Sequence, residues 1–272
     1  MLDELSRESY HRAVEVFKPL TRHAAIGSIL NGLTDSKVYV DNPEEPRCAL
    51  TWTRSRIFLS GELIDEDNRR RVAEAICSKL KLDSLHRGAK FFILYLDPGI
   101  HQLDFFELLD DVKIHPNTRN YYELDARTHE WGETPRGGLR LEVIDRHFLS
   151  GSYKNLDQVK EEMCSERGSV DDFLEKNVGV CGVIGDEMVS WCMSEYNHGS
   201  RYEIGIATVE KHRRKGLATV TADALMRRCL EHGFSRVGWH CWQRNEPSNR
   251  TALKLGFEFV ESYPIYVLEV ES

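Results

Sequence analysis

A helix needs about 20 consecutive apolar residues to cross a bilayer. No apolar run in the 272-residue sequence approaches that length. Its first 23 residues mix acidic and basic side chains, where a secretory signal would have an uninterrupted apolar segment. The basic excess needed for sequence-independent binding to nucleic acid is also missing, because the formal net charge is -8. We therefore expect a cytoplasmic protein with neither membrane nor nucleic acid as a partner. Its oligomeric state does not follow from these data.

The sequence has no C-x-x-C pair, although it contains seven cysteines. Their wide scatter and odd number favour neither a zinc site nor a redox site, so we predict no metal site. Most of them are expected to be small buried hydrophobes. Cys241, on a predicted strand, could be a nucleophile, but packing is the commoner role of a buried cysteine.

A stretch rich in Gly, Pro and charge, residues 126–140, interrupts the periodic pattern and predicts a connector between two units. Before it, residues 48–62 resemble paired strands, and the acidic start and apolar spacing of residues 64–82 predict a helix. Further predictions for this half are helices over residues 8–17, 23–33 and 102–112, and strands over residues 90–97 and 119–125.

The second half repeats much of this order. Three consecutive strands are predicted over residues 178–185, 188–196 and 202–209, and an amphipathic helix over residues 217–233. A strand (236–242), a helix (247–255) and two last strands (258–262 and 265–270) complete an α/β unit with a mixed sheet. We infer a duplicated architecture; the alternative is two unrelated α/β units with the same order of elements.

The segment Arg-Arg-Lys-Gly-Leu-Ala, which begins at Arg213, lies where a predicted strand ends and a long helix begins. Unpaired backbone amides converge at such a helix start, and its partial positive charge attracts anions. Gly216 allows a ligand to approach the backbone closely, and Ala218 leaves room in the first turn. A pyrophosphate is the expected ligand, and the alternative is a basic surface loop before an ordinary helix.

Arg213, Gly216 and Ala218 match the signature of the GNAT acetyltransferase superfamily: Gln or Arg, two residues, Gly, one residue, then Gly or Ala. Asn245, followed eleven residues later by Gly256-Phe257, matches a second family motif. The resemblance covers residues 140–270, and it is closer still to a branch with a GNAT-like unit before the catalytic one.

This resemblance implies an α/β (α+β) fold with a mixed, mostly antiparallel sheet flanked by helices, in two tandem GNAT-like units. Residues 1–125 would be a degenerate unit without a cofactor loop, and residues 137–272 the catalytic unit that binds acetyl-CoA. The function implied is transfer of an acetyl group from acetyl-CoA to a primary amine of a small molecule, by direct attack in a ternary complex. The alternative is a catalytically weak acyl-CoA-binding sensor or regulator.

The resemblance also implies which residues contact the cofactor. The backbone of Ile206, Ala207 and Thr208 would pair with the pantetheine amides, and Asn245 and Ser248 would flank the pantetheine arm. The pyrophosphate would be held by one continuous segment: Arg213, Arg214, Lys215, Gly216, Leu217, Ala218 and Thr219.

Glu203 is the candidate catalytic base. It lies on a predicted strand with its side chain on the same face as Gly205 and Ala207, whose small size would leave space around it. An amine must lose a proton before it attacks a thioester, which is the reaction that a carboxylate here could assist. The alternatives are a solvated strand carboxylate or a partner for Arg201.

A tyrosine that often protonates the leaving thiolate in this family is missing, because Ala252 occupies its position. His240, Tyr263 or Tyr266 could replace it, or acid catalysis could be dispensable for so good a leaving group. Trp239 and Trp242 are expected to be core residues more than pocket residues. The sequence does not identify the acceptor amine.

Overall fold

The computed structural model describes residues 1–100, 105–132 and 138–270, and the chain forms two compact units. The N-terminal unit comprises Met1–Arg119 and Tyr263–Ser272, and the C-terminal unit comprises Asn120–Ser262. Two long strands, β6 (Val112–Asp125) and β12 (Glu258–Val270), supply residues to both units. These units differ from the intervals 1–125 and 137–272 expected from the sequence, because β12 carries the end of the chain back into the N-terminal unit.

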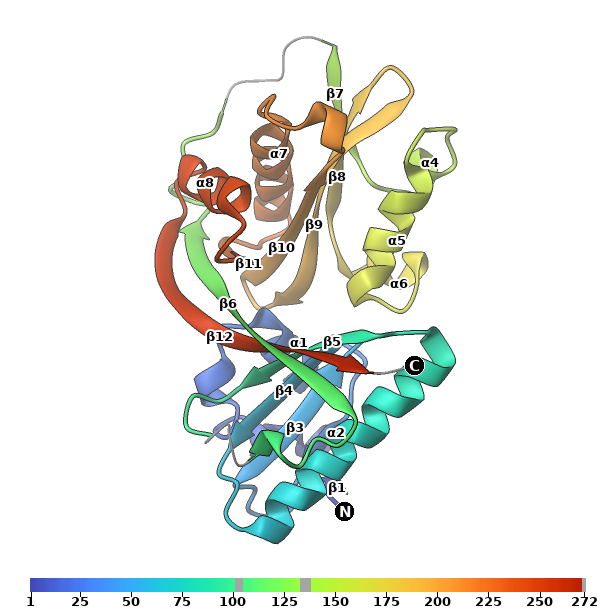
Figure 1. The fold of residues 1–272 in the computed structure, drawn as a ribbon. Helices are drawn as coiled ribbons and strands as arrows, with labels where there is room; N and C mark the ends of the chain where they lie inside the picture. Colours follow the sequence, from blue (N-terminus) through green and yellow to red (C-terminus); the bar gives the residue numbers. More distant parts are fainter. Residues whose placement is uncertain (101–104, 133–137, 271–272) are drawn as a thin grey trace. The chain divides into compact units, whose positions relative to one another are not determined.

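The N-terminal unit is a sheet with short helices and one long helix (Figure 1). Its strands follow the order β1-β2-β3-β4-β5-β12, and β4 and β5 are parallel neighbours. The elements are β1 (Asp3–Glu4), the 3-10 helices η1 (Arg7–Ala13) and η2 (Lys18–Leu20), α1 (Ala24–Leu30), β2 (Val38–Val40), β3 (Cys48–Thr53), β4 (Arg56–Gly61), α2 (Glu66–Arg87) and β5 (Phe91–Leu96).

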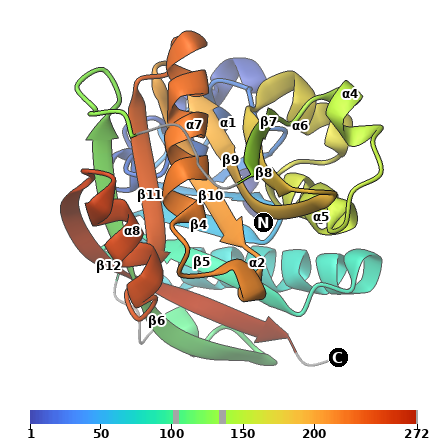
Figure 2. The ribbon, with the colours of Figure 1, turned by 90° about the horizontal axis from the view of Figure 1, so that it is seen from above.

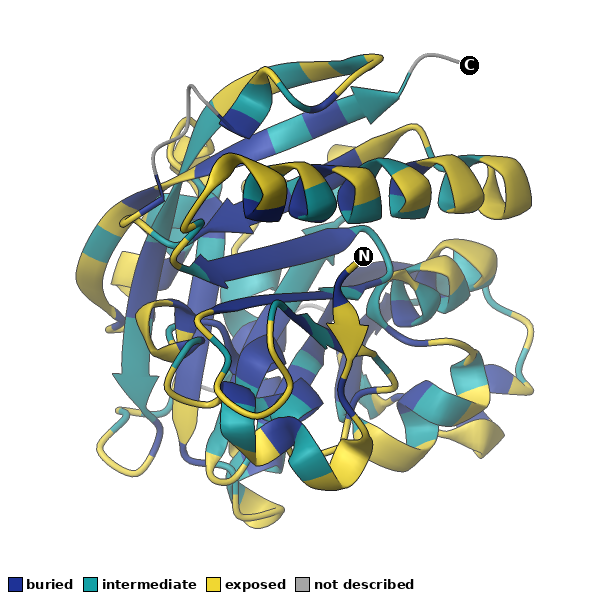
Figure 3. Ribbon diagram, turned by 90° about the horizontal axis from the view of Figure 1, so that it is seen from below, coloured by how far each residue is buried: buried dark blue, intermediate teal, exposed yellow. Residues whose placement is uncertain are grey.

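Helix α2 begins and ends where its sequence dictates. The Asp65 side chain caps its start by accepting a hydrogen bond from the Asn68 amide at 2.7 Å, and Gly88 ends it in the left-handed conformation, with φ of 62°. Its inner face packs Val72, Ile76 and other apolar residues into the core, while its outer face is exposed (Figure 3). The run Arg69 to Arg71 lies on this helix, where Arg70 and Arg71 pair with acidic residues one turn earlier.

The C-terminal unit has the strand order β6-β11-β10-β9-β8-β7. Its elements are β7 (Leu139–Val143), α4 (Arg146–Leu149), α5 (Leu156–Glu166), α6 (Val170–Lys176), β8 (Gly179–Ile184), β9 (Glu187–His198), β10 (Arg201–Thr208), η3 (Glu210–His212), α7 (Leu217–Glu231), β11 (Arg236–Trp242) and α8 (Glu246–Lys254). All its neighbouring strands from β7 to β10 are antiparallel, whereas β10 and β11 are parallel.

Two hydrophobic clusters cover opposite faces of this sheet. Tyr202 and Ile204 of β10 pack with α7 and α8, whereas Trp191 and Met193 of β9 pack with α4, α5 and α6. In Figure 1, α7 and the group α4 to α6 accordingly lie on opposite sides of β8, β9 and β10. Helix α8 lies next to α7, which it contacts (Figure 2). Because side chains alternate along a strand, Glu203 belongs to the face covered by α4, α5 and α6.

The fold class predicted from the sequence is confirmed, including the tandem arrangement, since both units contain a strand, a helix and a parallel strand: β4-α2-β5 and β10-α7-β11. No helix in the described part of the chain is long and apolar enough to span a membrane.

Several details differ from the prediction. Residues 258–270 form the single strand β12, because Pro264 removes only one amide donor from it. Residues 8–17 form a 3-10 helix and turns in place of an α-helix, and α4, α5 and α6 were not predicted. The helix predicted over residues 102–112 begins outside the described residues, and its described part, from Phe105, is mostly turn. The predicted connector includes residues 133–137, which also lie outside the described residues.

Candidate active site

Strands β10 and β11 separate soon after they begin. In the described part of the chain their ladder has three pairs, and it ends where Glu203 faces Gly238. On its other side, β10 remains paired with β9 as far as Thr208. Beyond Glu203, the backbone of β10 therefore has no ladder partner on β11. This is the stretch that contains Ile206, Ala207 and Thr208, all of them partly exposed.

The β10–α7 loop (residues 209–216) leads from this opening to helix α7. Two of its residues adopt the left-handed conformation, Arg214 with φ of 61° and Gly216 with φ of 77°. Glycine adopts this conformation without steric cost because it has no Cβ, whereas the Cβ of Arg214 makes the conformation unfavourable. The guanidinium of Arg213 donates to the Thr208 carbonyl at 3.2 Å, which ties the loop back to the end of β10.

The N-terminus of α7 is suited to an anion. The Val220 amide donates to the Gly216 carbonyl at 3.2 Å, so the amides of Leu217, Ala218 and Thr219 have no carbonyl one turn earlier in the helix. The first turn contains no acidic residue, and Arg214 and Lys215 are exposed beside it. Amides, macrodipole and cationic side chains together fit a pyrophosphate.

Glu203 and His240 face each other at the last pair of the β10–β11 ladder. The carboxylate Oε1 lies 3.4 Å from the imidazole Nε2, and the two side chains are only 3% and 5% exposed. Gly238 makes this possible, since a Cβ there would lie 3.3 Å from both Glu203 and Tyr121. The sequence predicted a carboxylate at this place but did not predict that an imidazole would lie beside it.

Tyr121 completes the group from strand β6. Its ring stacks on His240 with the centroids 4.4 Å apart and the planes at 10°. Its hydroxyl donates to Glu123 and accepts from Arg201 at 2.9 Å. Burial, followed by the hydrogen bond to Glu123, raises the pKa of the Tyr121 phenol. Arg201 also contacts Glu123, at 3.1 Å. Tyr121 therefore remains a neutral phenol that holds the plane of the His240 ring.

The space beside Gly205 is filled, contrary to expectation. A Cβ at this position would lie 2.5 Å from the carboxylate oxygen Oε1 of Glu195. Glu195 reaches this place because β9 carries an extra residue opposite the step from Tyr202 to Ile204, which is a β-bulge. Gly205 therefore makes room for a second carboxylate on the face of Glu203, a feature with no signal in the local sequence.

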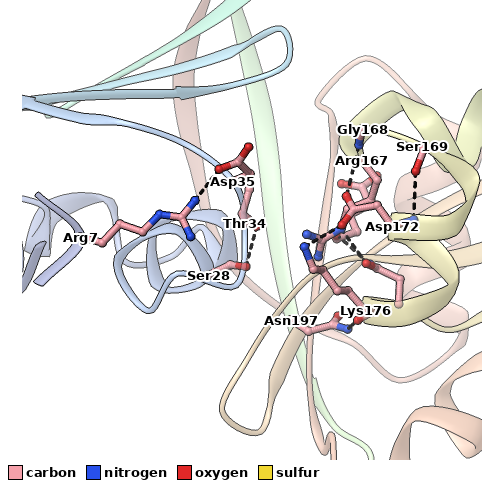
Figure 4. A network of polar contacts seen from close by, with 12 residues as sticks. Arg7, Ser28, Thr34, Asp35, Arg167, Gly168, Ser169, Asp172, Lys176 and Asn197 are labelled. Atoms are coloured by element: carbon pink, nitrogen blue, oxygen red, sulfur yellow. Dashed lines mark hydrogen bonds and ion pairs between the residues drawn. The ribbon is translucent and has the colours of Figure 1, made fainter. Parts of the chain in front are cut away.

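The turn between α5 and α6, on this same face, is fixed by a polar network (Figure 4). Asp172 accepts from the Gly168 amide at 3.2 Å and pairs with Lys176 at 2.6 Å. The Asn197 side chain donates to the Lys176 carbonyl at 2.6 Å, which joins α6 to β9. Arg167 is 3% exposed, and burial lowers the pKa of its guanidinium. The turn between α5 and α6 is thus fixed to β9 by hydrogen bonds and by burial.

The second family motif lies at the start of α8. Asn245 caps the helix by accepting from the Ser248 amide at 3.3 Å, and it is exposed. The Ser248 hydroxyl accepts from the Trp239 indole at 3.0 Å. Asn249, which the sequence analysis did not single out, donates to the carbonyls of Trp242, Gln243 and Asn245 and accepts from Tyr122 at 2.7 Å. These hydrogen bonds fix the backbone conformation of the residues that precede α8.

Several side chains considered as acids or nucleophiles are core residues. Cys241 is 5% exposed, and Trp239 and Ala252 belong to the same cluster. Tyr263 and Tyr266 lie in the N-terminal unit, Tyr263 near Tyr95 and Tyr266 against Phe106.

The expectation for the cysteines is confirmed, because all seven are free and five are buried: Cys48, Cys181, Cys192, Cys229 and Cys241. Burial raises the pKa of the Cys229 thiol to about 12.

Comparison with known proteins identifies the family of this chain. The sequence model described as GNAT acetyltransferase matches residues 15–266. The uncharacterized N-acetyltransferase YdfB of Bacillus subtilis (strain 168) is 27% identical over 267 residues, with 98% of each chain covered.

Solved structures share the fold. A GCN5-related N-acetyltransferase-like protein from Streptococcus suis has a TM-score of 0.68 at 23% identity, covering 96% of this chain and 99% of that one. A tandem GNAT protein from the clavulanic acid biosynthesis pathway has a TM-score of 0.57 at 13% identity, covering 100% and 99%. Since the family match covers nearly the whole chain, the protein belongs to the GNAT acetyltransferase family and is an acyl-CoA-dependent N-acyltransferase.

Proposed function

We propose that the protein transfers an acetyl group from acetyl-CoA to a primary amine of a small molecule, by direct attack in a ternary complex. The observation that carries this proposal is the separation of β10 from β11 immediately after Glu203. It leaves strand backbone open between a helix N-terminus suited to pyrophosphate and a buried carboxylate suited to proton transfer. The catalytic unit is the C-terminal one, and the N-terminal unit is a degenerate copy.

In this proposal the described residues hold acetyl-CoA along β10 and α7. The open backbone of Ile206 to Thr208 pairs with the amides of the pantetheine arm, and the amides from Arg214 to Thr219 bind the pyrophosphate. Asn245 and Ser248 lie along the pantetheine at the start of α8. In the N-terminal unit, β4 and β5 stay paired over four residues, Arg56 to Leu59 in β4, so the equivalent opening is closed.

Glu203 acts as the base. The carboxylate first accepts a proton from the ammonium form of the amine, which frees the lone pair of the nitrogen. The neutral amine then attacks the thioester carbonyl carbon, the carbon–sulfur bond breaks, and the second proton that the nitrogen loses passes to the departing thiolate of CoA. His240 lies beside Glu203 and shares the same buried environment, so it orients the carboxylate. A backbone amide near Ala207 or Thr208 stabilises the carbonyl oxygen.

The assignment of the α7 N-terminus is tested by the isosteric pair Ala218→Asp and Ala218→Asn. Asp in the first turn adds a negative charge where the pyrophosphate binds, while it also favours the helix through the macrodipole. We expect the dissociation constant of CoA to rise at least about 30-fold more for Asp than for Asn, without loss of stability. Calorimetric titration with CoA and acetyl-CoA, together with thermal unfolding, measures both effects.

Equal affinity of the two Ala218 variants would remove the loop assignment, and no CoA binding by the folded parent would overturn the proposed function. Binding of acetyl-CoA without turnover of any amine in a broad panel would favour a sensor. The buried Ala252, in place of the tyrosine acid, is the observation in favour of that alternative.

A further inference from the structure

Glu187, the first residue of β9, holds the β10–α7 loop just before the helix start. Its carboxylate oxygen Oε1 lies 2.9 Å from Nζ of Lys211, and Oε2 lies 3.4 Å from Nε2 of His212. The side chains of Glu187 and His212 are only 16% and 15% exposed. One carboxylate thus contacts two consecutive residues of the loop.

The carboxylate is itself held in place from the other side. The Asn155 side chain, at the start of α5, donates to Glu187 Oε1 at 3.3 Å and to the Met188 carbonyl at 2.9 Å. The Met188 amide in turn donates to the Lys154 carbonyl at 3.2 Å. The hydrogen bond from Lys211, and a further one from His212, hold the pKa of Glu187 below its usual range, so it is ionised at neutral pH.

The loop needs such an attachment. Arg213 follows His212 directly, and its amide donates to the Glu210 carbonyl at 3.1 Å, which closes the turn η3. The next residue, Arg214, adopts a left-handed conformation that costs a non-glycine residue about 1 kcal/mol. A strained conformation persists where the surrounding structure determines it, and the contacts of Lys211 and His212 fix the start of this one.

We propose that Glu187 is a positioning residue that preorganises the amides at the start of α7 for the pyrophosphate of CoA. The inference rests on the proposed function and deepens it, because it assigns a role to a residue outside both family motifs. Glu187 acts through Lys211 and His212 on the geometry of the loop. By holding the loop in its binding conformation, it lowers the entropy cost of binding the cofactor.

Because Glu187 is charged, the direction in which CoA affinity changes when the charge is removed tests the proposal. A carboxylate near an anion site repels the anion, so a variant without this charge would bind CoA more tightly if charge alone mattered. If the carboxylate instead holds the loop, the same variant binds CoA less tightly. Glu187→Gln keeps the shape of the side chain and separates these two results.

The experiment is calorimetric titration of Glu187→Gln with CoA and with acetyl-pantetheine, which lacks the pyrophosphate. We expect the dissociation constant of CoA to rise about tenfold, which is equivalent to 1.4 kcal/mol, and that of acetyl-pantetheine to stay unchanged. Lys211→Met, an exposed substitution that removes one contact, should shift CoA binding in the same direction. Glu210→Gln also removes one carboxylate charge, from the β10–α7 loop itself, and serves as the matched control.

Each outcome decides a different claim. Unchanged or tighter CoA binding by Glu187→Gln would overturn the inference and leave the proposed function intact, whatever Lys211→Met does. Equal weakening for CoA and acetyl-pantetheine would also overturn it, because the effect would then be general. A parent protein that binds no CoA would overturn the proposed function itself. Weaker binding of CoA alone, with Glu210→Gln close to the parent, would confirm the positioning role.

Discussion

Glu203→Gln should lower the turnover number by at least about 100-fold, which is the lower range for loss of a general base. Glutamine has nearly the same size as glutamate, so it keeps the packing against Gly238, but it accepts no proton. Cofactor binding should change little, since the loop and the open backbone of β10 are untouched. The measurement is release of the CoA thiol from acetyl-CoA with an amine found by panel screening, and calorimetry measures cofactor affinity.

Glu195→Gln is the matched control, because it removes a carboxylate from the same face of the sheet. Its effect should appear in the KM of the acceptor more than in the turnover number. If Glu203→Gln kept a third or more of the parent turnover, the base assignment would be wrong. If His240→Gln abolished turnover while Glu203→Gln did not, the base role would pass to His240.

The parts of the site that lie on one short segment were predictable from the sequence. Gly216 and Ala218 have a fixed spacing at the junction of a strand and a helix, and the structure places that junction at the start of α7. The period of the apolar residues identified β8, β9, β10 and β11, because a strand buried on one or both faces imposes its pattern locally. Glu203 stays a prediction, which rests on the family resemblance and on its place on the same strand face as Gly205 and Ala207.

Features built by distant segments were not predictable in this way. Tyr121 stacks on His240 across 119 positions of sequence, and only the pairing of β6 with its neighbours brings them together. Glu195 reaches Gly205 through a β-bulge, which has no signature in composition or periodicity. The Glu187 contacts join a hairpin, a helix start and a loop, so they depend on register that a single sequence does not specify.

Gly61→Ala should destabilise the N-terminal unit by about 2 to 4 kcal/mol. Gly61 ends β4 with φ of 97°, and a Cβ there would lie 2.0 Å from the Arg47 carbonyl oxygen. That carbonyl accepts the Glu62 amide at 2.9 Å, and the Gly61 amide donates to Asp97 at 3.0 Å, so the backbone on both sides is held. The clash with backbone atoms can be relieved only by breaking these bonds.

Gly88→Ala is the matched control, since Gly88 also has a positive φ, 62°, but no atom from beyond its chain neighbours and the adjoining helix backbone lies within 4 Å of its added Cβ. Its free energy of unfolding should fall by only about 1 kcal/mol, which is the cost of a left-handed backbone conformation at a residue with a Cβ. Native-state hydrogen exchange read by mass spectrometry, on peptides that contain β4 and β5, assigns the loss of stability to this unit. Equal protection in the two variants would mean that the approach of Arg47 to the end of β4 does not persist in solution. A larger loss for Gly61→Ala would show that this turn is packed as closely as the distances indicate.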